Sequence, residues 1–507
     1  MSSFDALIIG AGHNGLAAAI TLQKRGRRVL VLEARSVAGG LCAAREFHPG
    51  FTAPGVLHDT FEVRAPLLDA LGLAQHGLSL RDADVPVHAP TSKDKGFILA
   101  HDPERSQLGE DQAGYAELCR VADAARGALS TALDAAPPPM IPGQVSDFFD
   151  FAKLGLSLRA LGAKDLYGFL RMLPMCIADL TRDHFKNETV MAALAGATLL
   201  DEYVGPWSAG TAARWLLQRA VSGKEVAGGP AALVRALKAS LESAGGSVRT
   251  GARVAALLVE KGQVVGVKLE GGEALRAGLV GVAIAPRALL PLLPPHALPL
   301  NVFDELSRVR ARGTSAKVHL ALEAPIETRG GRHERLRMGD SLDDLERAFD
   351  AIKYRQLSRA PALDVRQPTV ADLSLAPRDK AVASIWVNFA PYDVDGGWSD
   401  DRRKAVLDAV LARIERYDAG IRQKVIAAEV LDPKTLEAEY GAPNGNVHHA
   451  EMSLDQLLFM RPTLRLAHYR TPVEGLFLCG SGSHPGGGVR LAPGWLGARA
   501  ALEGWAS

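Results

Sequence analysis

The chain has 507 residues, of which 47% are hydrophobic and 23% are charged. This composition is typical of a folded globular protein and excludes a disordered or fibrous one, and the length favours two interleaved domains over a single core. The 58 basic and 57 acidic residues leave a formal net charge of +1. A charge so close to zero argues against nucleic acid as a partner.

The first motif is a glycine-rich turn between an expected strand and an expected helix. The apolar run 6–9 predicts a buried strand, the turn 10–15 follows it, and an Ala/Leu-rich helix is expected through about Lys24. In such a turn the first glycine permits the bend, the second lets a pyrophosphate approach the backbone, and the third allows close helix packing. The expected dinucleotide contacts are Gly10, Gly12, His13, Asn14 and Gly15.

The next expected strand, residues 28–32, ends at Glu33. An acid at this distance from the glycines accepts hydrogen bonds from the adenosine ribose and repels a 2′-phosphate. NAD and FAD both satisfy this arrangement. Ala34 and the glycine pair Gly39-Gly40 follow, and the pair lets the chain pass close to an extended dinucleotide, which favours FAD.

Here the chain resembles the FAD-binding amine oxidase and phytoene desaturase superfamily, in which a glycine pair follows the ribose-binding acid. Family members often have a basic residue just after the pair, whereas this chain has Leu41-Cys42. The resemblance implies FAD as the cofactor. It leaves open which polar contacts form after the pair.

A more specific motif stands near the C-terminus. Residues 476–480 predict a buried strand, and the loop 481–489 contains the string HPGGGV before a helix over 495–502. This segment resembles the flavin-closing segment of phytoene desaturases, carotenoid isomerases and the pyridine nucleotide-disulfide oxidoreductase domain-containing protein 2 group. Successive glycines would bring backbone N–H groups to the flavin edge. The resemblance implies cofactor contacts at Gly480, Gly487, Gly488 and Val489.

The central part of the chain completes the expected fold. A helix is expected over 228–244 and a strand meander over 251–285, where the resemblance places Val254 against the adenine. We expect a discontinuous Rossmann-type FAD-binding domain of the glutathione-reductase/amine oxidase type, interleaved with a mixed α+β substrate domain. The FAD-binding domain would span 1–90, 225–300 and 462–507, and the substrate or cap domain 91–224 and 301–461.

No second glycine fingerprint occurs in the two substrate-domain segments, so a separate NAD(P)H domain is not expected. The electron acceptor would then be simple, such as oxygen or a quinone. Cys42, Cys119, Cys176 and Cys479 are far apart and include no CxxC, which argues against a disulfide framework or a dithiol redox centre.

Several residues are candidates for the substrate side. Residues 148–184 predict one or two amphipathic helices with a break near Pro174, either as ordinary core or as a lid or membrane-surface patch. In the resembling family the stretch around Tyr203 and Trp207 borders the substrate cavity, although aromatic core packing fits the same residues.

The flavin itself is the expected reactive group, so catalytic residues are not assigned from the sequence. Three histidines, His448, His449 and His484, are candidates for a proton-handling or flavin-contacting role, and His484 fits a turn residue equally well. A metal site at the adjacent histidines is not expected because no carboxylate pair lies nearby.

The resemblance covers nearly the whole chain and implies an FAD-dependent oxidoreductase that dehydrogenates, saturates or isomerises a polyene-like C–C bond of a hydrophobic small molecule. The alternatives are a flavin amine oxidase and a non-catalytic FAD-binding protein that acts through protein partners. The first strand begins at about Asp5, and no apolar run is long enough to span a bilayer. We therefore expect a cytoplasmic location, with peripheral membrane contact as an option.

Overall fold

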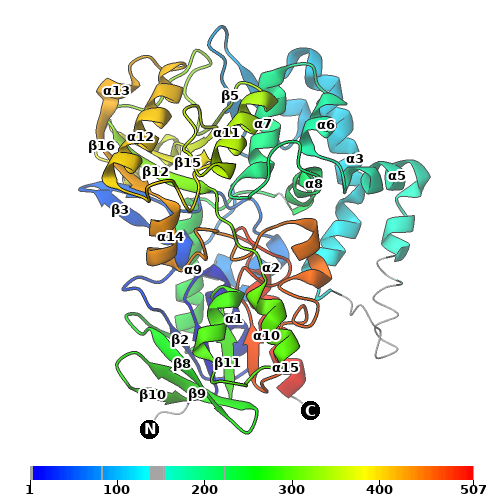
Figure 1. Ribbon diagram of the computed structural model, residues 1–507, viewed down its shortest axis with the longest axis vertical. Helices are drawn as coiled ribbons and strands as arrows, with labels where there is room; N and C mark the ends of the chain where they lie inside the picture. Colours follow the sequence, from blue (N-terminus) through cyan, green and yellow to red (C-terminus); the bar gives the residue numbers. More distant parts are fainter. Residues whose placement is uncertain (1–3, 82–83, 138–151, 153–154, 222, 506–507) are drawn as a thin grey trace.

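The structure is a computed structural model that describes residues 4–81, 84–137, 152, 155–221 and 223–505. Figure 1 shows two parts stacked along the long axis. The lower part contains both termini and a small parallel sheet, and the upper part contains a larger sheet and most of the helices. The fold prediction, a Rossmann-type domain interleaved with an α+β domain, is confirmed.

The lower part is organised by a five-stranded parallel sheet in the order β17-β11-β1-β2-β7. Its strands are short and almost entirely apolar, as expected for a parallel sheet that is covered on both faces. Their bounds are β1 Ala6–Ile9, β2 Val29–Leu32, β7 Ser247–Arg249, β11 Leu279–Val282 and β17 Leu476–Leu478.

Alternate side chains of these strands enter two cores. Ala6, Ile8 and Val31 pack with the helices α1 (His13–Gln23), α9 (Gly229–Ser243) and α15 (Ala492–Trp505). Leu7, Ile9 and Leu30 pack on the other side. That side is covered by a three-stranded antiparallel sheet, β8 Val254–Glu260, β9 Gln263–Leu269 and β10 Ala274–Arg276, and by α10 Leu300–Ser307. The expected helix and meander are therefore confirmed.

The upper part is built on a seven-stranded sheet in the order β16-β12-β15-β14-β13-β5-β6. Its strands come from two separate stretches of the chain, 87–99 and 315–431. The bounds are β5 Val87–Ala89, β6 Phe97–Leu99, β12 Ser315–Leu322, β13 Arg335–Met338, β14 Leu363–Arg366, β15 Ala381–Asn388 and β16 Val425–Leu431. A two-stranded hairpin, β3 Arg45–His48 and β4 Phe51–Ala53, packs beside it.

Helices cover both faces of this sheet. α12 (Asp400–Glu415) packs on one face through Val406, Val410 and Ile414. The other helices of the upper part are α3 Gln112–Asp134, α5 Gly162–Met172, α6 Ile177–Arg182, α7 Glu188–Leu199, α8 Thr211–Val221, α11 Leu342–Lys353, α13 Ile421–Lys424 and α14 Pro433–Tyr440. α2, Ala65–Leu71, belongs to the lower core.

The segment expected as amphipathic helices contains α5 and α6, which are separated around Pro174 as predicted. Residues 148–151 and 153–154 of that segment lie outside the described residues. Figure 1 shows α5 at the periphery of the upper part, away from both sheets. Within the described part of the chain, no helix has the length and apolar character needed to cross a membrane.

Candidate functional site

The cavity that contains most of the predicted cofactor contacts, called the main cavity below, lies where the parallel strands of the lower sheet end. It has a volume of about 300 Å³, and it runs from the turn after β1 past the end of β2 to the loop after β17. Ligands of open α/β sheets bind at this carboxyl edge. Nine of the predicted cofactor contacts line it: Gly10, Gly12, His13, Asn14, Gly15, Glu33, Ala34, Gly40 and Val254.

The glycines of the turn shape one wall of this cavity. Gly10 has a φ of +100°, which only glycine adopts readily. A Cβ atom added to Gly12 would meet no protein atom within 4 Å, so this residue faces open space. A Cβ on Gly15 would overlap the carbonyl oxygen of Gly10, so close packing of the helix on the strand requires glycine there.

Glu33 is held in place by the backbone around it. Its Oε2 accepts a hydrogen bond from the Ala11 N–H at 2.8 Å, and its Oε1 accepts one from the Arg35 N–H at 2.9 Å. Only 7% of the residue is exposed. The carboxylate therefore lies in a fixed orientation at the cavity wall, and it also ties the end of β2 to the glycine turn.

The two ends of the chain meet in this cavity. Asn14 donates a hydrogen bond from Nδ2 to Ser481 Oγ at 2.9 Å, and both residues line the wall. Gly480 permits close approach of its backbone to Ala283, because an added Cβ would lie 2.8 Å from the Ala283 carbonyl oxygen. The C-terminal loop thus closes the site that the N-terminal turn opens.

Five predicted cofactor contacts do not line the cavity: Gly39, Gly480, Gly487, Gly488 and Val489. Gly39 donates its N–H to the Ala11 carbonyl and so supports the turn. A Cβ added to Gly487 would overlap the ring of His448, and one added to Gly488 would overlap the carboxylate of Glu62. In this structure the glycine run packs against side chains of the protein, and its contact with a flavin stays a prediction.

Part of the cavity wall was not identified from the sequence. Residues 437–441, at the end of α14, line it, and the Arg35 guanidinium lies 4.2 Å from the centre of the Tyr440 ring. Leu57 and Val447 supply apolar wall. These residues are far from the glycine motifs in sequence and belong to no cofactor motif, so only the fold brings them to the site.

The three candidate histidines occupy different places. His449 lines the cavity, and burial lowers its pKa to about 4. His448 lies behind it, with a pKa well below the usual value because of burial and nearby arginines, and neither ring nitrogen has a hydrogen-bond partner among the described residues. His484 is fully buried, its Nε2 is 3.0 Å from the Ala132 carbonyl oxygen, and burial lowers its pKa to about 3.

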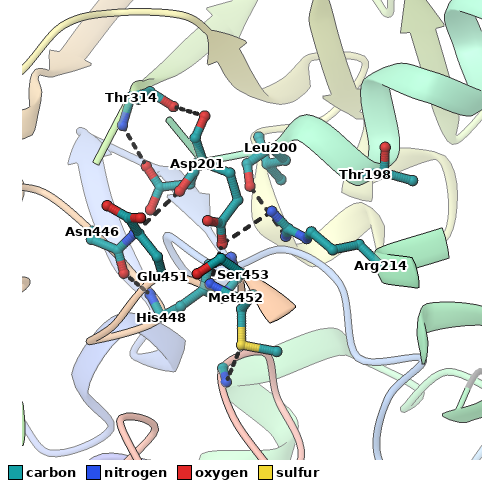
Figure 2. Close-up of polar contacts among 12 residues, drawn as sticks. Thr198, Leu200, Asp201, Arg214, Thr314, Asn446, His448, Glu451, Met452 and Ser453 are labelled. Atoms are coloured by element: carbon teal, nitrogen blue, oxygen red, sulfur yellow. Dashed lines mark hydrogen bonds and ion pairs between the residues drawn. The ribbon is translucent and has the colours of Figure 1, made fainter. Parts of the chain in front are cut away.

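A buried polar network fixes the segment that carries His448 and His449 (Figure 2). Asp201 accepts hydrogen bonds from the backbone N–H groups of Thr314 at 3.0 Å and Val447 at 2.7 Å. Glu202 forms an ion pair with Arg214 at 3.0 Å and accepts a hydrogen bond from the Met452 N–H at 3.0 Å. Burial raises the pKa of Asp201 to about 7, while the N–H donors act to lower it.

Tyr203 and Trp207, the predicted substrate-pocket residues, pack in the helical core of the upper part. The Tyr203 ring meets the Phe349 ring edge-on with their centroids 5.7 Å apart, and Arg182 lies 5.0 Å from the centre of the Trp207 ring. Neither residue lines the main cavity. Their contact with a substrate stays a prediction.

A second cavity, of about 140 Å³, lies in the upper part between the seven-stranded sheet and the helices α3, α7 and α8. A third, smaller space of about 30 Å³ is lined by Glu62, Arg214, His448, Gly487 and Arg490, among others. Gln218 lines both of these spaces. The upper part therefore has an internal space on each side of Gln218, and the smaller space reaches Gly487 of the C-terminal glycine loop.

One group of residues has the composition of a metal site. Ligand atoms of His58, Asp59 and Asp364 lie within 4.8 Å of one another. Cations already occupy this group: Lys317 Nζ is 2.9 Å from His58 Nδ1, and Arg335 Nη2 is 2.6 Å from Asp59 Oδ2. The arrangement is that of a buried ion-pair network.

Comparison with known proteins agrees with this geometry. The family described as flavin containing amine oxidoreductase matches residues 15–494. Pyridine nucleotide-disulfide oxidoreductase domain-containing protein 2 of Rattus norvegicus is 31% identical, over 97% of this chain and 92% of the relative. A phytoene desaturase (neurosporene-forming) of Cereibacter sphaeroides is 26% identical over 97% and 92% of the two chains.

A solved oxidoreductase from Methanosarcina mazei shares the fold, with a TM-score of 0.64 at 18% identity over 98% of this chain and 99% of that one. The predicted resemblance to the domain-containing protein 2 group is confirmed. The predicted cofactor, FAD, is confirmed by the family, and the long cavity with an open face at Gly12 and an oriented carboxylate at Glu33 fits an extended dinucleotide. The chain belongs to the flavin-containing amine oxidoreductase family.

Proposed function

We propose that this FAD-dependent oxidoreductase dehydrogenates, saturates or isomerises a C–C bond of a largely hydrophobic small molecule. The single observation that carries the proposal is the cavity of about 300 Å³ that both ends of the chain and α14 enclose together. Relatives named as phytoene desaturases and as a prolycopene isomerase support a C–C bond as the reacting group.

The chain's own residues would hold the cofactor along the cavity. The turn with Gly10, Gly12 and Gly15 offers helix N–H groups to the pyrophosphate, and Glu33 accepts hydrogen bonds from the adenosine ribose. Ala252 and Val254, which line the same cavity, would lie beside the adenine. When bound, FAD supplies the two-electron oxidation or reduction, so the protein needs no nucleophile of its own.

The protein would contribute orientation, exclusion of water and control of one proton. Leu41, Leu57 and Val447 supply apolar wall to the cavity. His449 is neutral at pH 7 because burial lowers its pKa to about 4, and its Nδ1 has no partner among the described residues. We propose that this neutral ring, which lines the cavity, handles the proton of the reaction.

An amine oxidase fits the family name but not the charges of the substrate half. Arg335 and Arg337 line the internal space, and the carboxylates of its described lining, Asp84 and Glu225, are each paired with an arginine, so neither is free to bind an ammonium substrate. We propose oxygen or a quinone as the electron acceptor.

The exposed side chains of α5 support the proposal that such a substrate reaches the protein from a membrane surface. On α5, Tyr167 is 71% and Leu170 is 50% exposed, with the exposed Lys164 on the same helix. Apolar and basic side chains together are typical of interfacial helices. Flotation with anionic vesicles should carry the parent protein, and Tyr167→Ser with Leu170→Ser should abolish it.

The function is tested by anaerobic reduction of the purified holoprotein with apolar alkenes, saturated hydrocarbons and primary amines, followed by flavin absorbance. Bleaching by an apolar hydrocarbon or reoxidation by an apolar alkene supports the proposal. Bleaching by amines alone would establish the amine oxidase. A flavin that responds to none of these, in a protein that captures protein partners, would indicate the non-catalytic alternative.

A further inference from the structure

The two faces of the seven-stranded sheet differ sharply in charge. Cross-strand pairing places Lys317, Trp386, Asp364 and Arg337 in one row, because each is the register partner of the next. A second row on the same face contains His319, Ser384, Arg366 and Arg335. The opposite face is apolar and is covered by α12.

The charged face forms the floor of the second cavity. Arg335 and Arg337 come from β13, whereas the walls are mostly apolar and come from the helices: Tyr115 from α3, Leu194 from α7 and Trp215 from α8. The space thus combines cationic groups at one side with apolar side chains around it. An amphipathic ligand has this division of chemistry.

The arginines of the cavity floor are deeply buried, and one of them has an N–H group without a hydrogen-bond partner among the described residues. Arg335 is 7% exposed, and its Nη2 binds Asp59 at 2.6 Å, but its Nε has no hydrogen-bond partner among the described residues. Arg337 donates to Asp364 Oδ2 at 2.9 Å and to the Ala193 carbonyl at 2.8 Å. A buried donor without an acceptor is costly, so a small movement of Arg335 that brings its Nε to the cavity surface would be favoured by an acceptor placed there.

The acidic residues in the cavity wall do not cancel the preference of this cavity for an anionic group. Glu225 forms an ion pair with Arg366, and Asp84 forms one with Arg105. Arg219, a third lining arginine, binds Asp123 at 2.6 Å and the His101 carbonyl. Each acid and each arginine of the described lining is therefore paired, and the Nε of Arg335 is a buried guanidinium N–H that still has no partner.

The internal space continues towards the cofactor. Gln218 separates the arginine-floored cavity from the smaller space beside His448 and Gly487. In that smaller space Arg490 binds Glu62 at 3.0 Å, and its Nη1 has no partner among the described residues. A ligand held by its charged end at Arg335 would extend along this line towards the C-terminal glycine loop.

We infer that the cavity between β13 and the helices α3, α7 and α8 recognises an anionic group, a carboxylate or a phosphate, at one end of an otherwise apolar substrate. Arg335 makes the charge-assisted contact, and the helix side chains contact the apolar body. The inference rests on the proposed function, because it names the class of its substrate. It requires that a hydrophobic substrate without an anionic end binds less well.

The test uses the purified holoprotein and four probes with the same chain: octanoate, octyl phosphate, octan-1-ol and octylamine. Binding is measured by calorimetry and by the shift in flavin absorbance. We expect at least one of the two anions to bind about tenfold or more tightly than the alcohol. The anion that binds more tightly identifies the headgroup. Equal affinity for octan-1-ol, or preferred binding of octylamine, would overturn the inference.

Variants locate the contact. Arg335→Gln should remove most of the anion preference while it leaves octan-1-ol binding unchanged, and Arg335→Lys, which keeps the charge but loses the Nε donor, should remove part of it. The matched control is Arg332→Gln, because Arg332 is exposed and binds Glu327 at 3.1 Å outside the cavity. An unchanged preference in either well-folded Arg335 variant places the anion elsewhere and refutes the assignment. If neither variant folds, the comparison of the four probes on the parent protein still tests whether the cavity prefers an anion.

The two proposals fail in different ways. If a neutral hydrocarbon reduces the flavin and no anion binds, the proposed function stands and the anion site falls. If anions bind in calorimetry but no organic substrate changes the flavin, the anion site stands and the oxidoreductase proposal falls.

Discussion

Glu33 gives the sharpest prediction about the cofactor site, because its carboxylate has two tasks. It accepts hydrogen bonds from Ala11 N–H and Arg35 N–H in the protein, and we propose that it also accepts from the ribose of FAD. A glutamine at this position keeps one oxygen acceptor but turns an amide N–H₂ towards one of the two donors. Glu33→Gln therefore tests the charge, and Glu33→Ala removes both acceptors.

The magnitudes follow from these contacts. A hydrogen bond to a charged group is worth about 1.5–3 kcal/mol, so loss of the ribose contacts should raise the Kd for FAD about 10- to 150-fold. A buried N–H without an acceptor costs about 1–3 kcal/mol, so the FAD-free protein should also lose stability. We expect the order parent, Glu33→Gln, Glu33→Ala for both quantities.

The assay is FAD release on dilution, followed by the fluorescence of the free cofactor, together with the Tm of the FAD-free protein. Glu260→Gln is the matched control, because Glu260 also stands at the end of a strand but its side chain is 61% exposed and binds Arg276. The reasoning is refuted if Glu33→Ala retains FAD on dilution as the parent does.

Three further predictions concern other parts of the site. Gly12→Val should fold with a near-parental Tm, because an added Cβ meets open space, but should hold no FAD in a heat-release assay. Gly487→Ala should cost about 1–3 kcal/mol through overlap with His448, and His448→Gly should restore most of that loss in thermal melts of the double variant. His484 has a folded-state pKa of about 3, below the unfolded value of 6.5, so the unfolded chain takes the proton first and stability falls as pH drops below about 6.5. Replacing His484 by Gln should lessen this fall by about 1.4 kcal/mol per pH unit, and a variant whose Tm falls with pH as steeply as that of the parent would contradict the assignment.

The sequence predicted those parts of the fold that depend on short-range patterns. The run 6–9 and the turn after it form a strand and a glycine turn because each neighbour in the chain is also a neighbour in space. The same holds for the C-terminal strand at Leu476–Leu478. Their meeting through Asn14 and Ser481 follows from the family resemblance and from the parallel pairing of β11 with β17.

The charged face of the upper sheet could not be predicted in this way. The alternation in Arg335–Met338 and Leu363–Arg366 is the pattern of strands with one face towards solvent. In the structure every residue of both strands is buried, because helices and the lower part cover the polar face. Alternation reveals which side chains share a face, but not what covers that face.

The cavity wall contributed by α14 was missed for a related reason. Residues 437–441 carry no glycine fingerprint and no charge pattern that indicates a dinucleotide. They reach the cofactor site only because the upper part lies over the strand ends of the lower part. Contacts between distant parts of the chain depend on domain packing, which single-sequence patterns do not encode.

The composite sheet also has a consequence for biosynthesis. The outer strand β17, which pairs with β11, and α15, which packs on α1, leave the ribosome after the other four strands of this sheet. Until they emerge, the hydrogen-bonding edge of β11 and the apolar side of α1 remain uncovered, a state prone to aggregation. A nascent chain that has already made its glycine turn must therefore wait for β17 and α15 before it can close around FAD, and chains truncated before β17 should be recovered without flavin.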